Sequence, residues 1–179
     1  MRIYDYASTA QAIRAPFSFF VVNDDDWSSS HNNNYWNKRF TDPTDINNVG
    51  TKKTIYDPSV SGFTLPKTAA FTSFTSSGDE TEEINSFNVL GSFTKGWSFY
   101  CNGWKSGETI FFPALGCRDI YSPRGGNGII VNVNVAGYYW TVGAASAENA
   151  RFMNFYSYRV SPQNNAGRSY GFTARPILE

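Results

Sequence analysis

The chain has no hydrophobic run close to the roughly eighteen residues that a membrane-spanning helix needs, so we expect no insertion into a membrane. A basic segment followed by an apolar one is also missing at the N-terminus, so no secretory signal peptide is expected. Charge of one sign is not in excess, because fifteen basic residues balance fifteen acidic ones. Without a basic stripe to replace phosphate counterions, nucleic acid is not an expected partner.

Histidine and cysteine are too scarce for most metal or nucleophilic chemistry. His31 is the only histidine and lies in an amide-rich stretch, so we expect it to be exposed rather than catalytic. Cys101 and Cys117 form no CxxC motif and no cysteine–histidine cluster, which argues against zinc. Two buried thiols are the favoured interpretation, and a disulfide stays open. The aspartate run 24–26 has no calcium-loop spacing and is interpreted as a solvated turn or helix cap. We therefore expect no enzyme, no cofactor and no metal.

Aromatic side chains are abundant, charged residues are sparse, and Gly, Asn, Ser and Thr are frequent. That composition favours short strands, many turns and long loops over a helical bundle. At 179 residues the chain fits one domain, or one domain with a short appendage. Residues 1–50 hold no motif that we can place and are either an N-terminal extension or the first part of the domain. Residues 51–179 are expected to form the main domain.

Local patterns predict short elements along the chain. Helices are expected at about 7–14 and 67–75, the second because apolar residues of that segment share one side. A loop is expected at 117–128, and the acidic run 79–83 should be solvated. Strands are expected at 16–22, 53–56, 97–101, 109–113 (buried on both faces) and 131–135 (half-exposed valines).

The last third of the chain has a different character. Residues 141–170 mix large aromatics, amides, small residues and arginines without an acid–base cluster. Such mixtures are typical of recognition surfaces, where tyrosine supplies contact area and small polar residues supply adaptable hydrogen bonds. Residues 152–156 alternate in character, so Met153 and Phe155 are predicted to be buried and the other three to be displayed.

Five segments resemble the motifs of one known family. Residues 56–66 read YDPSVSGFTLP, similar to a YDPCPxGxxxP motif before a helix, and residues 111–116 read FFPALG, similar to an FPAxGxR strand. The segments GYYW at 137–140, PQNN at 162–165 and RSYGFTARP at 168–176 resemble a GYYWS…PQNNNNRxxGFxVRP ending. The family is that of C-type lectin-fold proteins of Bacteroides-type gut bacteria and their phages, including the variable proteins of diversity-generating retroelements.

The resemblance covers about residues 53–179 and implies an α+β, C-type lectin-like fold with short helices and a loop-rich antiparallel β region. Ser59 departs from the motif, which has cysteine there, so thiol chemistry is excluded at that point. Formylglycine-generating enzymes share the broad fold but use a cysteine pair near the C-terminus, and no cysteine follows Cys117. The calcium and sugar motifs of animal lectins are also missing, so calcium-dependent sugar binding is not implied.

In the retroelement family, mutagenesis of adenines diversifies a displayed segment, here about residues 137–176. The resemblance implies that the frame is held by buried aromatics, among them Trp104, Trp140, Phe155 and Phe172. It also implies a variable ligand-binding surface made of Ser146, Glu148, Asn149, Arg151, Phe152, Asn154, Tyr156, Tyr158, Arg159, Ser161, Asn165, Ala166, Gly167, Ser169 and Tyr170.

The implied function is that of a receptor-binding protein or adhesin on a phage tail fibre or a bacterial surface. Its expected partner is a host cell-surface protein or glycan. A homo-oligomer is compatible with either location, and on a tail fibre it would be a trimer. Two alternatives stay open: a surface adhesin that is not diversified, and a structural tail or pilus subunit whose final segment is buried in an oligomer.

Overall fold

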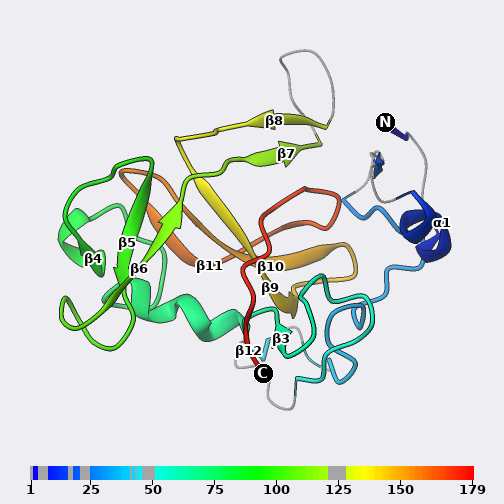
Figure 1. Cartoon of the computed structure of the whole chain (residues 1–179), viewed down its shortest axis with the longest axis horizontal. Helices are drawn as coiled ribbons and strands as arrows, with labels where there is room; N and C mark the ends of the chain where they lie inside the picture. Colours follow the sequence, from blue (N-terminus) through cyan, green and yellow to red (C-terminus); the bar gives the residue numbers. More distant parts are fainter. Residues whose placement is uncertain are drawn as a thin grey trace.

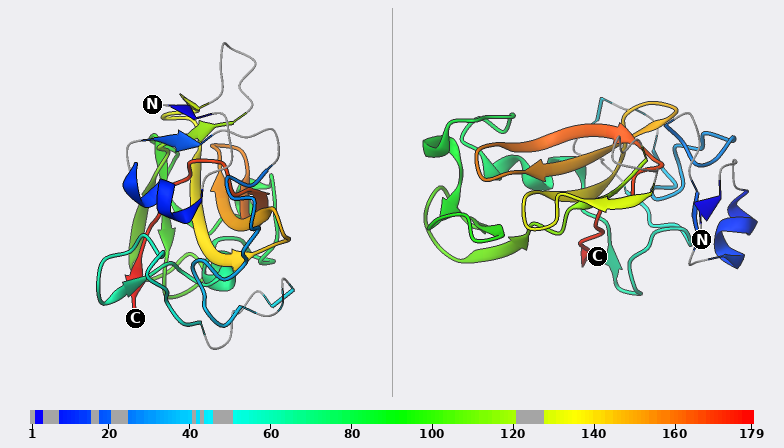
Figure 2. Two further views of the ribbon diagram at one scale, coloured as in Figure 1. Left: turned by 90° about the vertical axis from the view of Figure 1, so that its right-hand side faces the viewer. Right: turned by 90° about the horizontal axis from the view of Figure 1, so that it is seen from above.

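The computed structural model describes residues 2–3, 8–15, 18–20, 25–40, 42, 44–45, 51–120 and 128–179. Small antiparallel β sheets with few short helices make up most of it, which is an α+β-like class. A three-stranded sheet lies in the middle, with a second three-stranded sheet toward one end and helix α1 toward the other (Figure 1). Figure 2 shows the same order from above. Within the described ranges, no helix has the length and apolar character needed to cross a membrane.

The central sheet consists of consecutive antiparallel strands: β9 (Gly137–Ala144), β10 (Asn149–Phe155) and β11 (Val160–Gly167). Its order is β11–β10–β9, so β10 has a strand on each side. The register between β10 and β11 shifts near Met153, where Pro162 and Gln163 stand opposite one residue. A bulge is a place where a sheet tolerates proline, which cannot donate to the ladder.

The remaining elements are short. The second sheet has the order β4 (Val89–Leu90), β5 (Gly96–Tyr100), β6 (Thr109–Pro113) and is antiparallel. The strand pairs are β1 (Arg2–Ile3) with β2 (Phe19–Phe20) in parallel, and β3 (Phe63–Thr64) with β12 (Ile177–Leu178) and β7 (Cys117–Asp119) with β8 (Ile129–Val131) antiparallel. The helices are α1 (Thr9–Arg14) and the 3-10 helices η1 (Thr68–Phe74) and η2 (Ile84–Ser86).

Two hydrophobic clusters cover the two faces of the central sheet. Because successive side chains of a strand point to opposite faces, Tyr139 and Met153 enter one cluster while Tyr138 and Phe152 enter the other. The first cluster contains residues of η1, β5 and β6, among them Phe74, which stacks on Phe99 at a centroid distance of 4.0 Å. The second cluster is completed by half-buried residues from both ends of the chain. The central sheet is therefore the middle layer of the fold.

The helix predictions are confirmed within the described residues. Ser8 caps α1 by accepting from the N–H of Gln11 (3.2 Å), and the Gln11 side chain accepts from the N–H of Ser8 (2.7 Å). This capping box satisfies donors that would otherwise be unpaired at the start of the helix. The segment 67–75 forms η1, a 3-10 rather than an α helix, and it buries Phe71 and Phe74.

Strands are confirmed at 97–101 and 109–113, as β5 and β6. The expectation that 109–113 is buried on both faces is wrong, because only Phe112 is buried and Ile110 and Phe111 are exposed. Of the segment 16–22, Phe19–Phe20 is a strand, whereas 16–17 and 21–22 lie outside the described residues.

Two strand predictions are wrong. Only Lys53 of the segment 53–56 makes a bridge, to Asn37, before the chain turns. β8 ends at Val131, and 132–135 turn with Asn132 and Asn134 at φ values of 58° and 63°. Asparagine tolerates this left-handed conformation better than most residues, so alternation of valine with asparagine here marks a turn and not a strand.

Several burial predictions are also corrected. Cys117 is buried, as predicted, but Cys101 is exposed, and both are free thiols. Trp104, expected in the frame, is exposed, since it lies in the turn between β5 and β6. The segment 117–128 begins with strand β7 rather than a loop, and 121–127 lie outside the described residues. The acidic side chains of 79–83 are exposed, as predicted.

Candidate functional site

The structure sorts the predicted ligand-binding residues into three groups by burial. Ser146, Glu148, Tyr158 and Asn165 are exposed. Asn149, Arg151, Tyr156, Arg159, Ala166 and Tyr170 are half-buried. Phe152, Asn154, Ser161, Gly167 and Ser169 are buried, so the prediction that these five are displayed is wrong.

The sheet face that was expected to be displayed is covered by the chain that follows β11. Phe152 belongs to the second cluster, with ring centroids 4.6 Å from Phe172 and 5.9 Å from Trp140. Asn154 is 2% exposed, and its Oδ1 accepts a hydrogen bond from Asn164 Nδ2 (3.2 Å). Side chains along β10 alternate between the two faces of the sheet, and Met153 and Phe155 are fully buried, as predicted. The opposite face was predicted to be displayed, but it packs in the second hydrophobic cluster.

Gly167 cannot vary freely at its position. A Cβ there would lie 2.6 Å from the Cβ of Asp25 and 2.7 Å from its carbonyl oxygen. Ser169, in the turn that follows β11, donates its backbone N–H to the same carbonyl (3.0 Å). Any larger residue at 167 would push away the segment that holds Asp25.

The exposed candidates lie at opposite ends of β10. Ser146 and Glu148 belong to the turn that precedes the strand, and Asn165 in β11 pairs near that end. Tyr158 lies in the turn that follows the strand. A strand of seven residues separates these ends by roughly 20 Å, so the candidates form two surfaces and not one. We refer to residues 156–159 as the tyrosine turn. We call the surface at the other end of β10, where Ser146, Glu148 and Asn165 lie, the N-terminal junction.

The tyrosine turn is an ordered stack. The rings of Tyr156 and Tyr158 lie 5.4 Å apart at an interplanar angle of 29°. The guanidinium of Arg159 lies 5.2 Å from the centroid of Tyr156, an attractive cation–π geometry. It also lies 3.8 Å from a carboxylate oxygen of Glu80. Two rings and one cation are thus held together, and Tyr158 is 54% exposed.

Tyr156 connects this stack to the core. Its hydroxyl lies 2.6 Å from that of Tyr138, which also accepts from Asn132 Nδ2 (2.9 Å). Its carbonyl oxygen accepts from Trp97 Nε1 (2.9 Å). Burial, and then the hydrogen bond with Tyr156, raise the pKa of Tyr138, so this phenol stays neutral. Tyr156 therefore supports the turn, and Tyr158 is the side chain that faces solvent.

Arg168 organises the N-terminal junction. Its side chain is 7% exposed, and its Nη1 donates to Asp26 Oδ2 (3.3 Å). Nη2 donates to the carbonyl oxygen of Ser146 (2.7 Å) and to Asn33 Oδ1. The Arg168 backbone N–H donates to the carbonyl oxygen of Glu148 (3.1 Å). One arginine thus joins the turn before β10 to the segment 25–36, which carried no motif in the sequence.

Asp26 is fully buried, which corrects the prediction of a solvated turn at 24–26; residue 24 lies outside the described residues. Its Oδ1 accepts from the N–H of Ser28 (3.1 Å), and its Oδ2 lies 3.2 Å from His31 Nδ1. His31 is half-buried in this contact rather than freely exposed. Burial raises the pKa of Asp26 and lowers that of Arg168, so removing the pair from water penalises the charged form of each partner.

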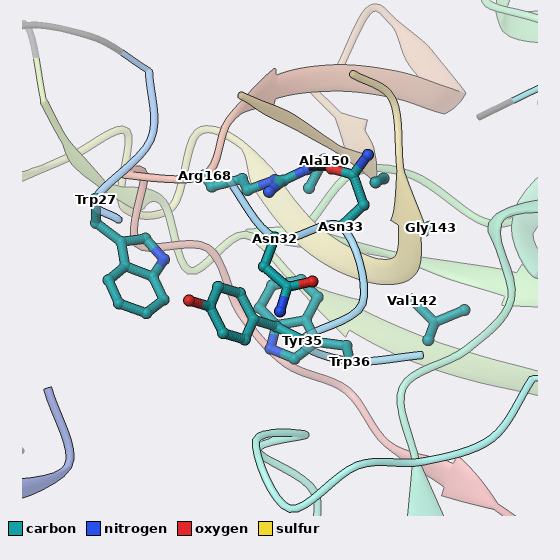
Figure 3. A pocket seen from close by; sticks show the side chains of 10 residues that line it. Trp27, Asn32, Asn33, Tyr35, Trp36, Val142, Gly143, Ala150 and Arg168 are labelled. Atoms are coloured by element: carbon teal, nitrogen blue, oxygen red, sulfur yellow. Dashed lines mark hydrogen bonds between the residues drawn. The ribbon is translucent and has the colours of Figure 1, made fainter. Parts of the chain in front are cut away.

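A pocket opens at the N-terminal junction (Figure 3). It has a volume of about 40 Å³. Its residues come from the segment 25–36, from β9, from β10 and from Arg168: Trp27, Asn32, Asn33, Tyr35, Trp36, Val142, Gly143, Ala144, Ala150 and Arg168. None of the predicted ligand-binding residues lines it. The signal in the sequence was the presence of Trp27, Tyr35 and Trp36 in an otherwise polar segment.

No group of three or more His, Cys, Asp or Glu side chains in the described ranges is placed to hold a metal ion. Burial raises the pKa of Cys117 to about 12, so its thiol is not an activated nucleophile. Ser28, Ser30 and Tyr35 share hydroxyl hydrogen bonds of 2.8–3.1 Å with one another, which fix the loop.

Comparisons with known proteins gave no match to a protein family, to a curated protein or to a solved structure.

Proposed function

We propose that the protein is a receptor-binding protein or adhesin on a C-type lectin-like scaffold, and that the tyrosine turn is its principal contact with a partner. The observation that carries this proposal is the exposed Tyr158, stacked on Tyr156, whose ring in turn contacts the guanidinium of Arg159. Tyrosine and arginine are the residues, with tryptophan, that most often dominate the energy of protein interfaces. A preformed stack also loses less side-chain entropy on binding than a mobile one.

The sequence motifs support the same scaffold. GYYW begins β9, and PQNN lies in β11. The segment 168–176 follows β11 and covers β10 through Phe172. These three segments belong to the central sheet or pack on it, and the tyrosine turn lies between the first two of them. By that resemblance the partner is a host cell-surface protein or glycan, and the location is a phage tail fibre or a bacterial surface.

The structure restricts which positions of a variable surface can change. Diversification would be tolerated at exposed positions such as Ser146, Tyr158 and Asn165, whereas changes at Phe152 or Gly167 would disturb packing. The surrounding DNA tests diversification: a near-identical template repeat, differing at adenines and beside a reverse transcriptase gene, is expected. Within it, differences should fall on codons for exposed residues.

Substitution of Tyr158 by serine tests the proposed contact. The labelled protein is titrated onto whole cells of a strain that it binds, found in a panel of gut bacteria. We expect Tyr158→Ser to weaken this binding by about tenfold or more, roughly 1.4 kcal/mol, since a central aromatic is lost. The melting temperature should stay within a few degrees, because Tyr158 is largely in solvent. Tyr156→Ser should lower both binding and melting temperature, because it also breaks contacts with Tyr138.

Trp104→Ser, which removes an exposed aromatic elsewhere, is the matched control and should bind as the unchanged protein does. Equal binding by Tyr158→Ser and the control would rule out the tyrosine turn as the contact. A structural subunit makes a different prediction: Tyr158 would be buried between copies, so the protein would be a stable oligomer that Tyr158→Ser dissociates. Light scattering on both variants separates these outcomes.

A further inference from the structure

Four turns meet at the end of the molecule where the tyrosine turn lies (Figure 1). The tyrosine turn joins β10 to β11, and the segment 91–95 joins β4 to β5. The segment 114–116 leads from β6 to β7, and 132–135 lies between β8 and β9. We call the surface that these four turns form the four-turn face. Binding residues are often found on loops that a rigid scaffold holds in place, so this face is a candidate interface.

Backbone hydrogen bonds join three of these turns. The N–H of Ala114 donates to the carbonyl oxygen of Lys95 (2.7 Å). The carbonyl oxygen of Ala114 accepts from the N–H of Asn134 (2.7 Å). The turn 114–116 is therefore held between the turns 91–95 and 132–135.

The tyrosine turn is tied to the same group on two sides. Asn132 Nδ2 donates to the Tyr138 hydroxyl (2.9 Å), which lies 2.6 Å from the hydroxyl of Tyr156. On the other side, Trp97 Nε1 donates to the carbonyl oxygen of Tyr156 (2.9 Å). The Trp97 ring also packs against Phe93 of the turn 91–95, at a centroid distance of 5.4 Å. The four-turn face is thus one continuous surface that exists before any partner binds.

The exposed side chains of this face are largely apolar. Leu115, Val133 and Val135 are 49%, 50% and 52% exposed, close to the value for Tyr158. Leu115 and the two valines lie on the two turns that the Ala114 carbonyl joins. Large apolar side chains gathered on one surface, rather than scattered singly, mark a place where a partner binds.

Charge restricts the partner further. The four turns contain two cations, Lys95 and Arg159, and no carboxylate. Arg159 lies 3.8 Å from a carboxylate oxygen of Glu80, so its charge is already balanced. Lys95 is exposed and forms no ion pair with any described residue. The complementary surface has apolar side chains at its centre and a carboxylate opposite Lys95.

A protein fits this face better than a glycan. The hydroxyl groups of a sugar would lose water over Leu115, Val133 and Val135 without gaining hydrogen bonds, which is unfavourable. Protein interfaces instead have an apolar centre and a polar rim, and a standard one takes about 20–30 residues from each side. Four turns of three to five residues each supply much of such a side.

We propose that the four-turn face binds a cell-surface protein, through an apolar patch that has a carboxylate at its edge. The inference rests on the proposed function and selects a protein, not a glycan, as the partner of the tyrosine turn. It also adds Leu115, Val133 and Val135 as contact residues beside Tyr158, with Lys95 at the rim.

Selective damage to the cell surface tests the class of partner. Whole cells of a strain that the protein binds are treated with proteinase K, which digests surface proteins, or with periodate, which oxidises the diols of glycans. Binding of the labelled full chain should fall by about tenfold or more after protease and stay unchanged after periodate. Binding that resists protease overturns the inference, as does any loss after periodate; in both cases the receptor-binding function stands. If no strain of the panel is bound, the proposed function and this inference both fall.

Two charge substitutions test the face itself. Val135→Asp should weaken binding to untreated cells by about tenfold or more, because an unpaired carboxylate would be buried at the centre of the interface. Val60→Asp is the matched control, since Val60 is an exposed valine outside the face. Lys95→Glu should weaken binding by about threefold to tenfold, because it faces a carboxylate of the partner. Lys67→Glu, at an exposed lysine elsewhere, is its control and should bind normally.

Each failure gives a different result. Unchanged binding by Val135→Asp overturns the four-turn face, and if Tyr158→Ser still binds weakly, the tyrosine turn stands without it. Weak binding by Val135→Asp with normal binding by Tyr158→Ser supports the face and removes Tyr158 as the principal contact. Sedimentation of the protein alone tests a second copy as the occupant: a dimer that Val135→Asp dissociates would overturn the inference.

Discussion

The two cysteines are expected to differ in reactivity, because they differ in burial. Cys101 directly follows β5 and is exposed, whereas Cys117 begins β7 and packs in the second cluster. Burial raises the pKa of Cys117 to about 12, and the nearby carboxylate of Asp119 adds to the effect. Since the thiolate is the reactive form, burial removes reactivity both by raising the pKa and by blocking access.

We therefore expect one reactive thiol in the native protein and two after unfolding. At pH 8 a chromogenic disulfide reagent should titrate Cys101 within minutes, while Cys117 stays protonated because the solution is far below its pKa. In denaturant Cys117 regains an ordinary thiol pKa and should react as well. Cys101→Ser should leave no fast-reacting thiol in the folded state. Fast reaction of two thiols in the native protein would contradict the burial of Cys117.

At the scale of elements, the sequence predicted strands and helices that have a local apolar pattern, such as β5, β6 and η1. The pattern did not predict burial equally well, because Ile110 and Phe111 of β6 are exposed. The turn at 132–135 was missed because valine and asparagine alternate there as in a strand, although asparagine also favours the left-handed backbone found at Asn132. The alternation along β10 was predicted correctly. Its second buried face could not be predicted locally, because the residue that covers Phe152 is Phe172, on a later segment.

The contact between Arg168 and Asp26 also joins two segments that are distant in the sequence. Its strength can be measured with a double-mutant cycle. Asp26→Ala leaves the guanidinium buried without its carboxylate and should lower the free energy of unfolding by about 3–5 kcal/mol. Arg168→Met should be similarly harmful, because it leaves the fully buried Asp26 without its guanidinium and with only Ser28 and His31 as partners. The double variant should lose about 1–3 kcal/mol less than the sum of the two, since neither charge is then left buried alone.

Urea denaturation of the four proteins at pH 7 provides the measurement, with Arg159→Met as the control for loss of a more exposed arginine. That control should cost at most about 1 kcal/mol. Additive losses in the cycle would show that Asp26 and Arg168 do not interact across the junction.

At the scale of the whole molecule, the two candidate sites lie at opposite ends of β10, the middle strand of the central sheet. Of the segments that resemble a known family, 137–140 and 162–165 belong to the central sheet, and 168–176 covers it through Phe172. The pocket could not be predicted from local sequence patterns. It forms where two distant segments meet, and the contact that joins them is between Asp26 and Arg168, 142 residues apart in the sequence. Residues 1–50 carry no motif, yet the segment 25–36 contributes Trp36 to the second cluster, where its ring lies 5.8 Å from Trp140.

If the segment 25–40 is part of the cooperative fold, its contacts should open only with the central sheet. The amide of Ser169 reports on this directly, since it donates to the carbonyl oxygen of Asp25, and the amide of Trp140 reports on the sheet through its bond to Thr173 (2.9 Å). Native-state hydrogen exchange should give both amides nearly the same free energy of opening, close to that of global unfolding. An appendage would instead open alone, and Ser169 would exchange at a much lower free energy than Trp140. In Asp26→Ala the protection of Ser169 should fall further than that of Trp140, because the substitution loosens the junction before it loosens the sheet.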